Sequence, residues 1–344
     1  MESDWIKTLY SNASAVLNIN GFLSKQIPLK RGVRQGCPLS SLLYVLVIEV
    51  LALQFRANPN IVGFKVGGEK IVSVHYMDDA TIIIKQNRCF KEVIKELNEY
   101  EDASGAKVNY DKSHGLWTGS WKGRRVSPMD IKWTSKNVEN LGVFFGNENP
   151  AIDTFNTILP SFTKRLNFWK QFKLTQIGKT RVVEIFLASK LIYATRFYPI
   201  PQDIQKTMQT AIYSYINFPS KVHTIGQAEM WKSKLNGGLK LINLAVKSGS
   251  AKVKWLIDIV TKENLNVNLL LFQRLLGAQK GNIEGKNLIF LQKSYFSRHL
   301  KTKSAFYKEA LLSVGTLEVK KGIPTLDHWD NEHIFFNPLF ATAD

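Results

Sequence analysis

Two adjacent carboxylates, Asp78 and Asp79, are the residues in this chain whose type and spacing best suit chemistry. Ile71–His75 before them alternates β-branched with smaller or polar side chains, and Thr81–Ile84 after them is almost entirely β-branched. This pattern predicts two strands joined by a turn centred on Met77 and Asp78. Two neighbouring carboxylates repel each other unless a cation or solvent separates them, and Mg²⁺ prefers such oxygen ligands. The sequence therefore predicts either a metal site or a solvated turn.

A second stretch of interest is a glycine-punctuated loop that precedes a long apolar segment: Arg31-Gly32-Val33-Arg34-Gln35-Gly36-Cys37-Pro38-Leu39-Ser40. Ser40 is predicted to cap a helix over residues 41–56, and this helix is predicted to be buried because it is apolar nearly all round. Its first N–H groups then point toward the loop, which suits a phosphate or a base edge. Alternatively, the glycines serve only the turn and the arginines are solvated.

Taken together, the loop and Tyr76-Met77-Asp78-Asp79 resemble the palm of reverse transcriptases, most closely that of non-LTR (LINE-type) retrotransposons. The family pattern Arg-Gly-Val-Arg-Gln-Gly-Cys-Pro-Leu-Ser-Pro is matched except at Ser41, and Met77 stands where this family usually has alanine. The resemblance implies that Asp78 and Asp79 are catalytic and hold two Mg²⁺ ions. It also implies a set of residues that contact the incoming nucleotide and the template: Arg34, Gln35, Gly36, Tyr76 and Met77.

Two later segments resemble the same family. After an amphipathic helix over residues 90–100, Val108–Ser113 matches a segment whose lysine lies near the departing pyrophosphate, here Lys112. A solvated loop lysine is the alternative. Leu141-Gly142-Val143 resembles the strand that grips the primer, so Leu141 and Gly142 are predicted to contact it.

Basic and aromatic residues interleave between Pro160 and Arg181, where the sequence has no Asp or Glu. This composition fits a thumb lobe whose cations pair with the phosphates of a nucleic-acid backbone. The alternative is an amphipathic helix with a solvated basic face. The candidate phosphate contacts are Lys164, Arg165, Lys170, Lys173, Lys179 and Arg181.

Composition narrows the classes of partner. The 344 residues carry a formal net charge of +18, which favours a polyanion, either nucleic acid or an anionic membrane surface. Eight Trp and twenty Phe interleaved with the basic residues fit nucleic acid better. The two cysteines cannot form a zinc knuckle and indicate a reducing compartment. The start resembles no signal peptide, and the longest apolar run, Leu42–Leu53, is too short to span a bilayer. We expect no zinc, no membrane partner and an intracellular protein, and the resemblance implies the nucleus.

The expected fold class is α+β: an incomplete right-hand polymerase palm, built from an antiparallel sheet with helices, followed by a mainly helical thumb and C-terminal region. The expected limits are residues 1–148 for the palm, 149–235 for the thumb-like region and 236–344 for the connection and C-terminal region. A Gly-Gly-Leu segment at 237–239 resembles one that follows the polymerase domain in this family. No chemistry is assigned to residues 260–344.

The resemblance implies an RNA-directed DNA polymerase with RNA template, DNA primer and dNTP as partners. In the family a third aspartate, on an earlier strand, completes the metal site, and the fingers precede it. Because no such segment precedes Trp5, we expect an N-terminally truncated palm that is inactive by itself and leaves an unpaired edge beside the hairpin. The alternative is a non-catalytic nucleic-acid-binding remnant of a retroelement. A third interpretation is a helical interaction protein that uses the C-terminal half.

Overall fold

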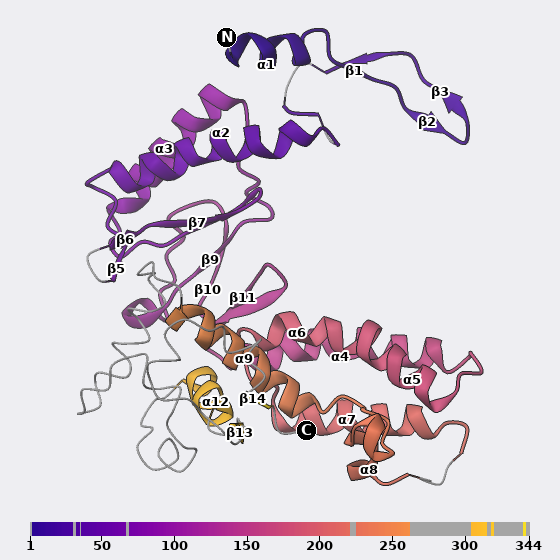
Figure 1. Cartoon of the computed structure of the whole chain (residues 1–344). Coiled ribbons are helices and arrows are strands. Elements are labelled where there is room, and N and C mark those ends of the chain that lie inside the picture. The colour runs from indigo at the N-terminus through magenta and orange to yellow at the C-terminus, as the bar shows by residue number, and fades with distance from the viewer. Residues whose placement is uncertain are drawn as a thin grey trace. The chain divides into compact units, whose positions relative to one another are not determined.

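The computed structural model describes residues 2–29, 32–34, 36–66, 69–220, 225–261, 304–314, 318–319 and 340–341. The chain divides into two compact units (Figure 1). The first unit comprises Met1–Ser113 and Ser127–Ile131, and the second comprises His114–Val126 and Lys132–Asp344. The expected limit between palm and thumb lay at residue 148, whereas the second unit already takes in most of the chain from residue 114.

The first unit combines helices with antiparallel strand pairs. In the part of it that the structure describes, strands pair only two by two: β1 with β4, β2 with β3, β5 with β6, and β7 with β8. The elements are α1 (Glu2–Tyr10), β1 (Ser14–Ala15), β2 (Asn18–Ile19), β3 (Phe22–Leu23), β4 (Ile27–Pro28), α2 (Pro38–Ala57), β5 (Phe64–Val66), β6 (Glu69–Ile71), β7 (Ser73–Tyr76), β8 (Asp79–Ile82) and α3 (Cys89–Ser104).

A small apolar core of the first unit joins α2 and α3 to the β7–β8 hairpin. Its fully buried members come from the C-terminal half of α2, from α3, and from Ile61 and Val72, which flank the β5–β6 pair. Among the described residues the β7–β8 pair joins no further strand. The mixture of helices and small antiparallel sheets agrees with the α+β class.

The N-terminus of α2 differs from the expected one. The helix begins at Pro38, whose ring fits the first helical position, and the extended residue before it is Cys37. Ser40 therefore lies inside the first turn, and its hydroxyl donates to the carbonyl oxygen of Arg34 instead of capping a backbone N–H. The capping prediction was wrong because proline can occupy only the early helical positions, which fixes the helix start before Ser40.

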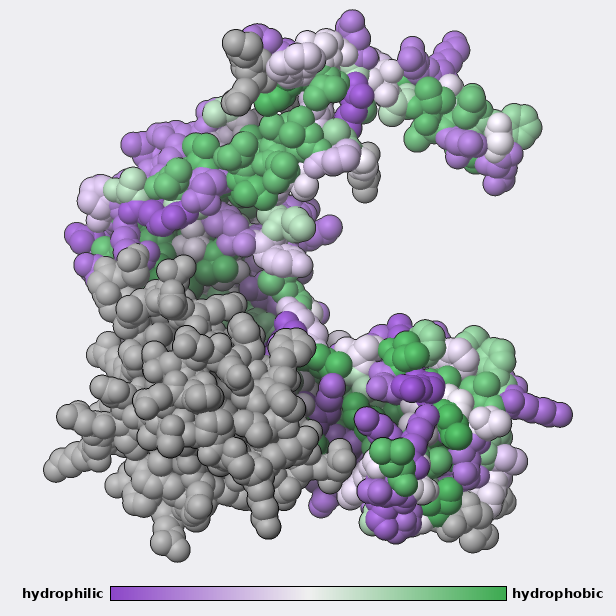
Figure 2. All heavy atoms as spheres, in the orientation of Figure 1, coloured by the Kyte–Doolittle hydropathy of each residue, from purple (hydrophilic) through white to green (hydrophobic). Residues whose placement is uncertain are grey.

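Most of α2 is exposed, which contradicts the prediction of a buried helix. Its buried residues are Ser40, Leu51, Ala52 and Phe55, whereas Leu42 and Leu46 are 63% and 67% exposed. Figure 2 shows apolar side chains gathered over α2 and over the β2–β3 hairpin. An all-round apolar helix buries only the side that other elements reach, and here the core reaches its C-terminal half.

The length of α2 also bears on the membrane argument. The helix has 20 residues and is long and apolar enough to cross a bilayer, the only one of the described helices of which this is true, and 22% of its most apolar stretch is buried. The argument from the shorter run Leu42–Leu53 is therefore wrong. Length and composition are weak grounds for a membrane span, because core helices of soluble proteins meet the same test.

The second unit is mainly helical. Two strand pairs precede the α-helices of this unit: β9 (His114–Leu116) is parallel to β10 (Lys132–Thr134), and β11 (Asn137–Asn140) is antiparallel to β12 (Val143–Gly146). The helical elements are η1 (Gly119–Trp121), α4 (Pro150–Trp169), α5 (Gln176–Val182), the π-helical η2 (Val183–Ala188), α6 (Ser189–Thr195), α7 (Gln202–Asn217), α8 (Gln227–Trp231), η3 (Lys234–Asn236), α9 (Leu244–Thr261) and α12 (Ala305–Val314), with the short pair β13 (Glu318–Val319) and β14 (Phe340–Ala341).

Contacts explain why the chain divides ahead of residue 148. The N–H of Phe144 on β12 donates to Thr154 Oγ1 on α4 at 3.0 Å, and the Tyr198 hydroxyl donates to the Phe144 carbonyl at 2.9 Å. The β11–β12 hairpin is thus attached to the helices that follow it. One apolar cluster then runs from Phe155 on α4 to Leu244 on α9, so the expected limit at residue 235 falls within a continuous core.

Candidate active site and nucleic-acid surface

The Asp78–Asp79 pair lies at the tip of the β7–β8 hairpin. Tyr76 is paired with Asp79, which leaves Met77 and Asp78 as the two turn residues and confirms the predicted hairpin. Met77 has a φ of 52°, a left-handed conformation that is uncommon for a bulky side chain. All four side chains are exposed. The local sequence therefore presents two carboxylates to solvent on a short turn.

Tyr44 of α2 is a neighbour of this tip that sequence reasoning missed. Burial raises the pKa of its phenol, and the charges of Tyr100, Asp78 and Asp79 raise it further. The acidic pair thus acts electrostatically on a neutral hydroxyl that projects from α2. The available signal in the sequence was a single tyrosine within an otherwise aliphatic run.

His75 lies directly before the tip on β7. Its Nε2 is 3.0 Å from Ser73 Oγ, and burial lowers the pKa of the imidazole. The charge of Glu49 opposes this shift and that of Arg56 adds to it, so α2 supplies the charged groups that His75 faces. The lowered pKa favours the uncharged form of His75, the histidine that lies three residues before Asp78.

The donor chemistry of the tip fits a hard divalent cation, because two carboxylates offer oxygen ligands and Mg²⁺ takes several further ligands from water or phosphate. No group of three or more His, Cys, Asp or Glu that could hold a metal ion occurs among the described residues. Asp78 and Asp79 are therefore two candidate ligands, and a metal-binding role for them stays a prediction.

The glycine-punctuated loop is anchored to α1. The Arg34 guanidinium lies 5.7 Å from the centre of the Tyr10 ring, and the Tyr10 hydroxyl lies 3.0 Å from Ser40 Oγ. Gly36 has a φ of 87°, so this glycine is required by the turn. Gln35 lies outside the described residues. The contacts of Arg34 show how the loop is held, and its nucleotide-binding role stays a prediction.

The start of α2 favours negative charge at this loop. The pKa of the Cys37 thiol is lowered, chiefly by the backbone N–H of Leu39. Burial opposes this shift, and hydrogen bonds from Tyr10 and Ser40 add smaller contributions that lower the pKa further. This is the behaviour expected where helix N–H groups lack intrahelical partners. Tyr44 follows Cys37 by about two helical turns, roughly 10 Å along the axis. Helix α2 thus connects the anion-favouring loop with the neighbourhood of the Asp78–Asp79 tip.

The remaining predicted contacts lie on loops and turns. Lys112 is exposed in the loop after α3, where its N–H donates to Asn109 Oδ1 at 3.2 Å. In the second unit, Leu141 and Gly142 have φ values of 52° and 75° and form the turn between β11 and β12. The expected strand therefore starts only at Val143, because a two-residue turn with positive φ takes up the residues before it.

Among the basic residues of the thumb-like segment, Lys164 and Lys173 are exposed and Lys170 is partly buried. Arg165 donates to the carbonyl oxygen of Phe186 at 3.2 Å and is otherwise exposed. Arg181 is exposed and forms an ion pair of 2.8 Å with Glu184.

Lys179 does not belong to this exposed set. Lys179 is only 6% exposed, and its ammonium donates to the carbonyl oxygen of Ile216 at 3.3 Å and to that of Phe218. The prediction that it contacts a phosphate is corrected: it bonds the C-terminal carbonyls of α7, which lack intrahelical partners.

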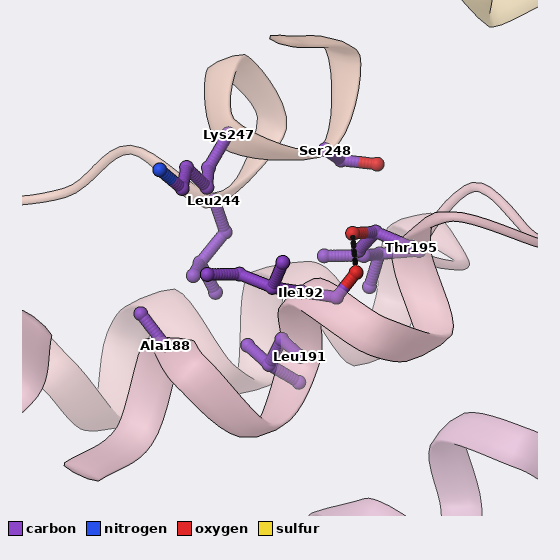
Figure 3. Close-up of a pocket in the computed structure, with 8 residues that line it drawn as sticks. Ala188, Leu191, Ile192, Thr195, Leu244, Lys247 and Ser248 are labelled. Atoms are coloured by element: carbon purple, nitrogen blue, oxygen red, sulfur yellow. Dashed lines mark hydrogen bonds between the residues drawn. The ribbon is translucent and has the colours of Figure 1, made fainter. Parts of the chain in front are cut away.

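A small hollow lies where α9 packs on α6 (Figure 3). Its lining is largely apolar, and the Thr195 hydroxyl on its wall already donates to the Ile192 carbonyl at 2.9 Å. The free volume of about 10 Å³ has room for one water molecule at most. None of the predicted site residues lines it, so we assign it no ligand.

Comparisons with known proteins reach into both units. Residues 1–145 match the model of the family described as reverse transcriptase (RNA-dependent DNA polymerase). The chain is 26% identical over 345 residues to an uncharacterized protein of transposon TX1 from Xenopus laevis, an alignment that covers 98% of this chain. It is also 28% identical over 109 residues to a Pol polyprotein of a type-2 retrotransposable element from Drosophila melanogaster, and 22% identical over 258 residues to that of the type-1 element R2 from Popillia japonica.

The matched residues contain both the loop and the Asp78–Asp79 hairpin, so residues 1–145 are a reverse transcriptase domain. The retrotransposon proteins that the chain resembles place this domain in the non-LTR, LINE-type class of reverse transcriptases. The chain spans 26% of the length of the Xenopus relative, 10% of the Drosophila one and 35% of the Popillia one.

Proposed function

We propose that the chain contributes to the active site of an RNA-directed DNA polymerase that extends a DNA primer on an RNA template. The observation that carries this proposal is the pair of exposed carboxylates at the β7–β8 tip, within the residues that match the reverse transcriptase family. Reverse transcriptases act on a template, a primer and dNTPs and use divalent metal ions. Asp78 and Asp79 would hold Mg²⁺, which would supply charge compensation for nucleotidyl transfer.

The chain's own residues position the substrates in this proposal. Arg34 and Gly36, with the N–H groups at the start of α2, orient the phosphates of the incoming nucleotide and the template base, as the lowered pKa of Cys37 supports. Tyr76 and Met77 flank the carboxylates on the hairpin and contact the nucleotide. Lys112 neutralises the departing pyrophosphate.

We further propose that this chain, tested by itself, binds divalent ions weakly and does not extend a primer. Within the described residues two carboxylates meet at the tip, without a third His, Cys, Asp or Glu beside them. Catalysis by two metal ions depends on fixed coordination of both, and two exposed carboxylates provide less than that.

Nucleic-acid binding without catalysis is the second candidate for the isolated chain. It is supported by the net charge of +18 and by the exposed side chains of Lys164, Arg165 and Lys173. Cations paired with phosphates release condensed counterions, so this function predicts an affinity that falls steeply with salt.

The test compares the full chain with Asp78→Asn and with the control Asp102→Asn, which alters an exposed aspartate on α3. Each protein is assayed for primer extension on RNA with Mg²⁺, for RNA binding at several salt concentrations, and for backbone cleavage by hydroxyl radicals generated from added Fe²⁺ in place of Mg²⁺. We expect no extension, equal salt-sensitive binding, and cleavage near residues 76–80 that only Asp78→Asn abolishes.

The outcomes separate the parts of the proposal. Cleavage that persists unchanged in Asp78→Asn refutes the metal site. Extension by the unchanged chain that Asp78→Asn removes and Asp102→Asn retains refutes the inactivity of the isolated chain and supports the active site. Affinity that does not change with salt refutes nucleic-acid binding.

A further inference from the structure

Three tryptophans and an arginine form a cluster in the second unit that the proposed function does not use. Trp117 and Trp133 stack with their ring centres 4.2 Å apart and their planes 22° apart. Trp121 meets Trp117 edge-on at 5.6 Å. The Arg124 guanidinium lies 4.2 Å from the centre of the Trp121 ring and 5.7 Å from that of Trp117. We call these four residues the Trp–Arg cluster.

The loop between β9 and β10, which carries Trp117, Trp121 and Arg124, is held by hydrogen bonds. The N–H of Trp117 donates to the Thr134 carbonyl at 2.9 Å, and the N–H of Gly123 donates to Ser135 Oγ at 2.9 Å. The side chain of Asn147 donates to the carbonyl oxygens of both Trp117 and Ser135. The backbone under the cluster is therefore organised before any ligand binds, which lowers the entropic cost of binding.

The inner side of the cluster is tightly packed against strand β9. A Cβ added at Gly115 on β9 meets the Trp133 ring at 2.3 Å, so the strand lies directly against the indole. Trp117 is 3% exposed and belongs to this packed inner part. Trp121 and Arg124 form the outer part and are partly exposed. Packing alone explains the inner pair, while the outer pair presents an indole and a flat guanidinium at the surface.

We propose that Trp121 and Arg124 form a stacking site for an unpaired nucleobase of single-stranded RNA or DNA, with Lys122 and Arg125 contacting the flanking phosphates. Indole faces and guanidinium planes stack on any base, and neighbouring cations pair with the backbone. Both Lys122 and Arg125 are exposed on the same loop. The inference rests on the proposed function in that the chain binds nucleic acid, and it names a place where one base is held.

The test is a cycle of protein and ligand changes on the full chain. The ligands are a fluorescent single-stranded oligonucleotide and a fully abasic strand of the same length, which keeps the phosphates and removes the bases. The first variant, Trp121→Ala, removes the indole. The second, Arg124→Lys, keeps the positive charge and removes the planar guanidinium. The control is Arg196→Lys, the same exchange at an exposed arginine after α6. Unfolding by urea is measured for each variant.

We expect Trp121→Ala to bind the normal strand about 5- to 100-fold more weakly and the abasic strand unchanged. Arg124→Lys should lose part of the same affinity for the normal strand, and Arg196→Lys should lose none. If both strands weaken equally in Trp121→Ala, or if neither does, the stacking site is refuted while salt-dependent binding by the unchanged chain still supports the proposed function. If the unchanged chain binds neither strand, both proposals fail. Should Trp121→Ala unfold, the comparison of the two strands with Arg124→Lys decides.

Discussion

Lys179 offers a sharp test of which basic residues serve folding and which serve nucleic acid. Its ammonium is buried and donates to the carbonyl oxygens of Ile216 and Phe218 at the C-terminus of α7. The rings of Tyr215 and Phe218 lie 5.8 and 5.9 Å from the ammonium. Burial lowers the pKa of this lysine, which shows that desolvation of the charge offsets part of what these contacts contribute.

The change is Lys179→Met, which keeps most of the side-chain volume. It leaves two carbonyls without their donor, at about 1–3 kcal/mol each, while relieving the desolvation of the ammonium. We therefore expect a net loss of about 2 kcal/mol in the free energy of unfolding. The matched variant is Lys164→Gln on the exposed face of α4, which should change stability by less than about 0.5 kcal/mol.

Two assays distinguish the variants. Urea unfolding, followed by circular dichroism, measures stability, and filter binding of single-stranded RNA over a range of salt measures the number of phosphate contacts. Lys164→Gln should reduce the slope of log K against log salt by about 0.7, the value for one phosphate contact on a single strand. Lys179→Met should leave this slope unchanged. The opposite result, a stable Lys179→Met protein with a reduced slope, refutes the assignment of Lys179 to the α7 C-terminus.

Three further predictions follow from buried or polarised groups. Because burial lowers the pKa of His75, the unfolded chain binds the imidazole proton more readily, so the stability of the fold falls as the pH drops below the ordinary histidine pKa of about 6.5. The urea midpoints at about pH 7.5 and 5.5 should therefore differ more in the unchanged chain than in His75→Gln. Equal differences in the two proteins contradict this prediction. Iodoacetamide should alkylate Cys37, whose pKa is lowered, faster than the buried Cys89, and peptide mass spectrometry measures both rates. Equal rates in the folded chain contradict the influence of the α2 N–H groups on the Cys37 thiol. Lys252 is fully buried and forms an ion pair of 2.7 Å with Glu309, whose side chain is 25% exposed. Glu309→Gln leaves the buried ammonium without its counter-charge and should lower the free energy of unfolding in urea by about 3 kcal/mol, more than Lys252→Met, which removes the buried charge itself. A larger loss in Lys252→Met than in Glu309→Gln counts against the ion pair.

The sequence by itself determined the hairpin that presents Asp78 and Asp79. Its β-branched runs favour strands, and a two-residue turn between them sets the register, so the position of the carboxylates depends on interactions within a dozen residues. The same holds for the turn at Gly36, where the positive φ needs glycine. The two motifs together also sufficed to indicate the reverse transcriptase family, which the match to residues 1–145 confirms.

Only the tertiary structure decided which side chains are buried. The apolar pattern of α2 predicts a buried helix, yet Leu46 is exposed because the core reaches only the C-terminal half of α2. The basic pattern around Lys179 predicts a phosphate contact, yet the carbonyls of α7, some 40 residues away in sequence, accept its hydrogen bonds. The Trp–Arg cluster brings Trp133 onto Trp117 across a strand pairing that no local pattern specifies. Backbone conformation follows from near neighbours, whereas burial depends on which distant elements pack against a residue, and that information lies in the fold.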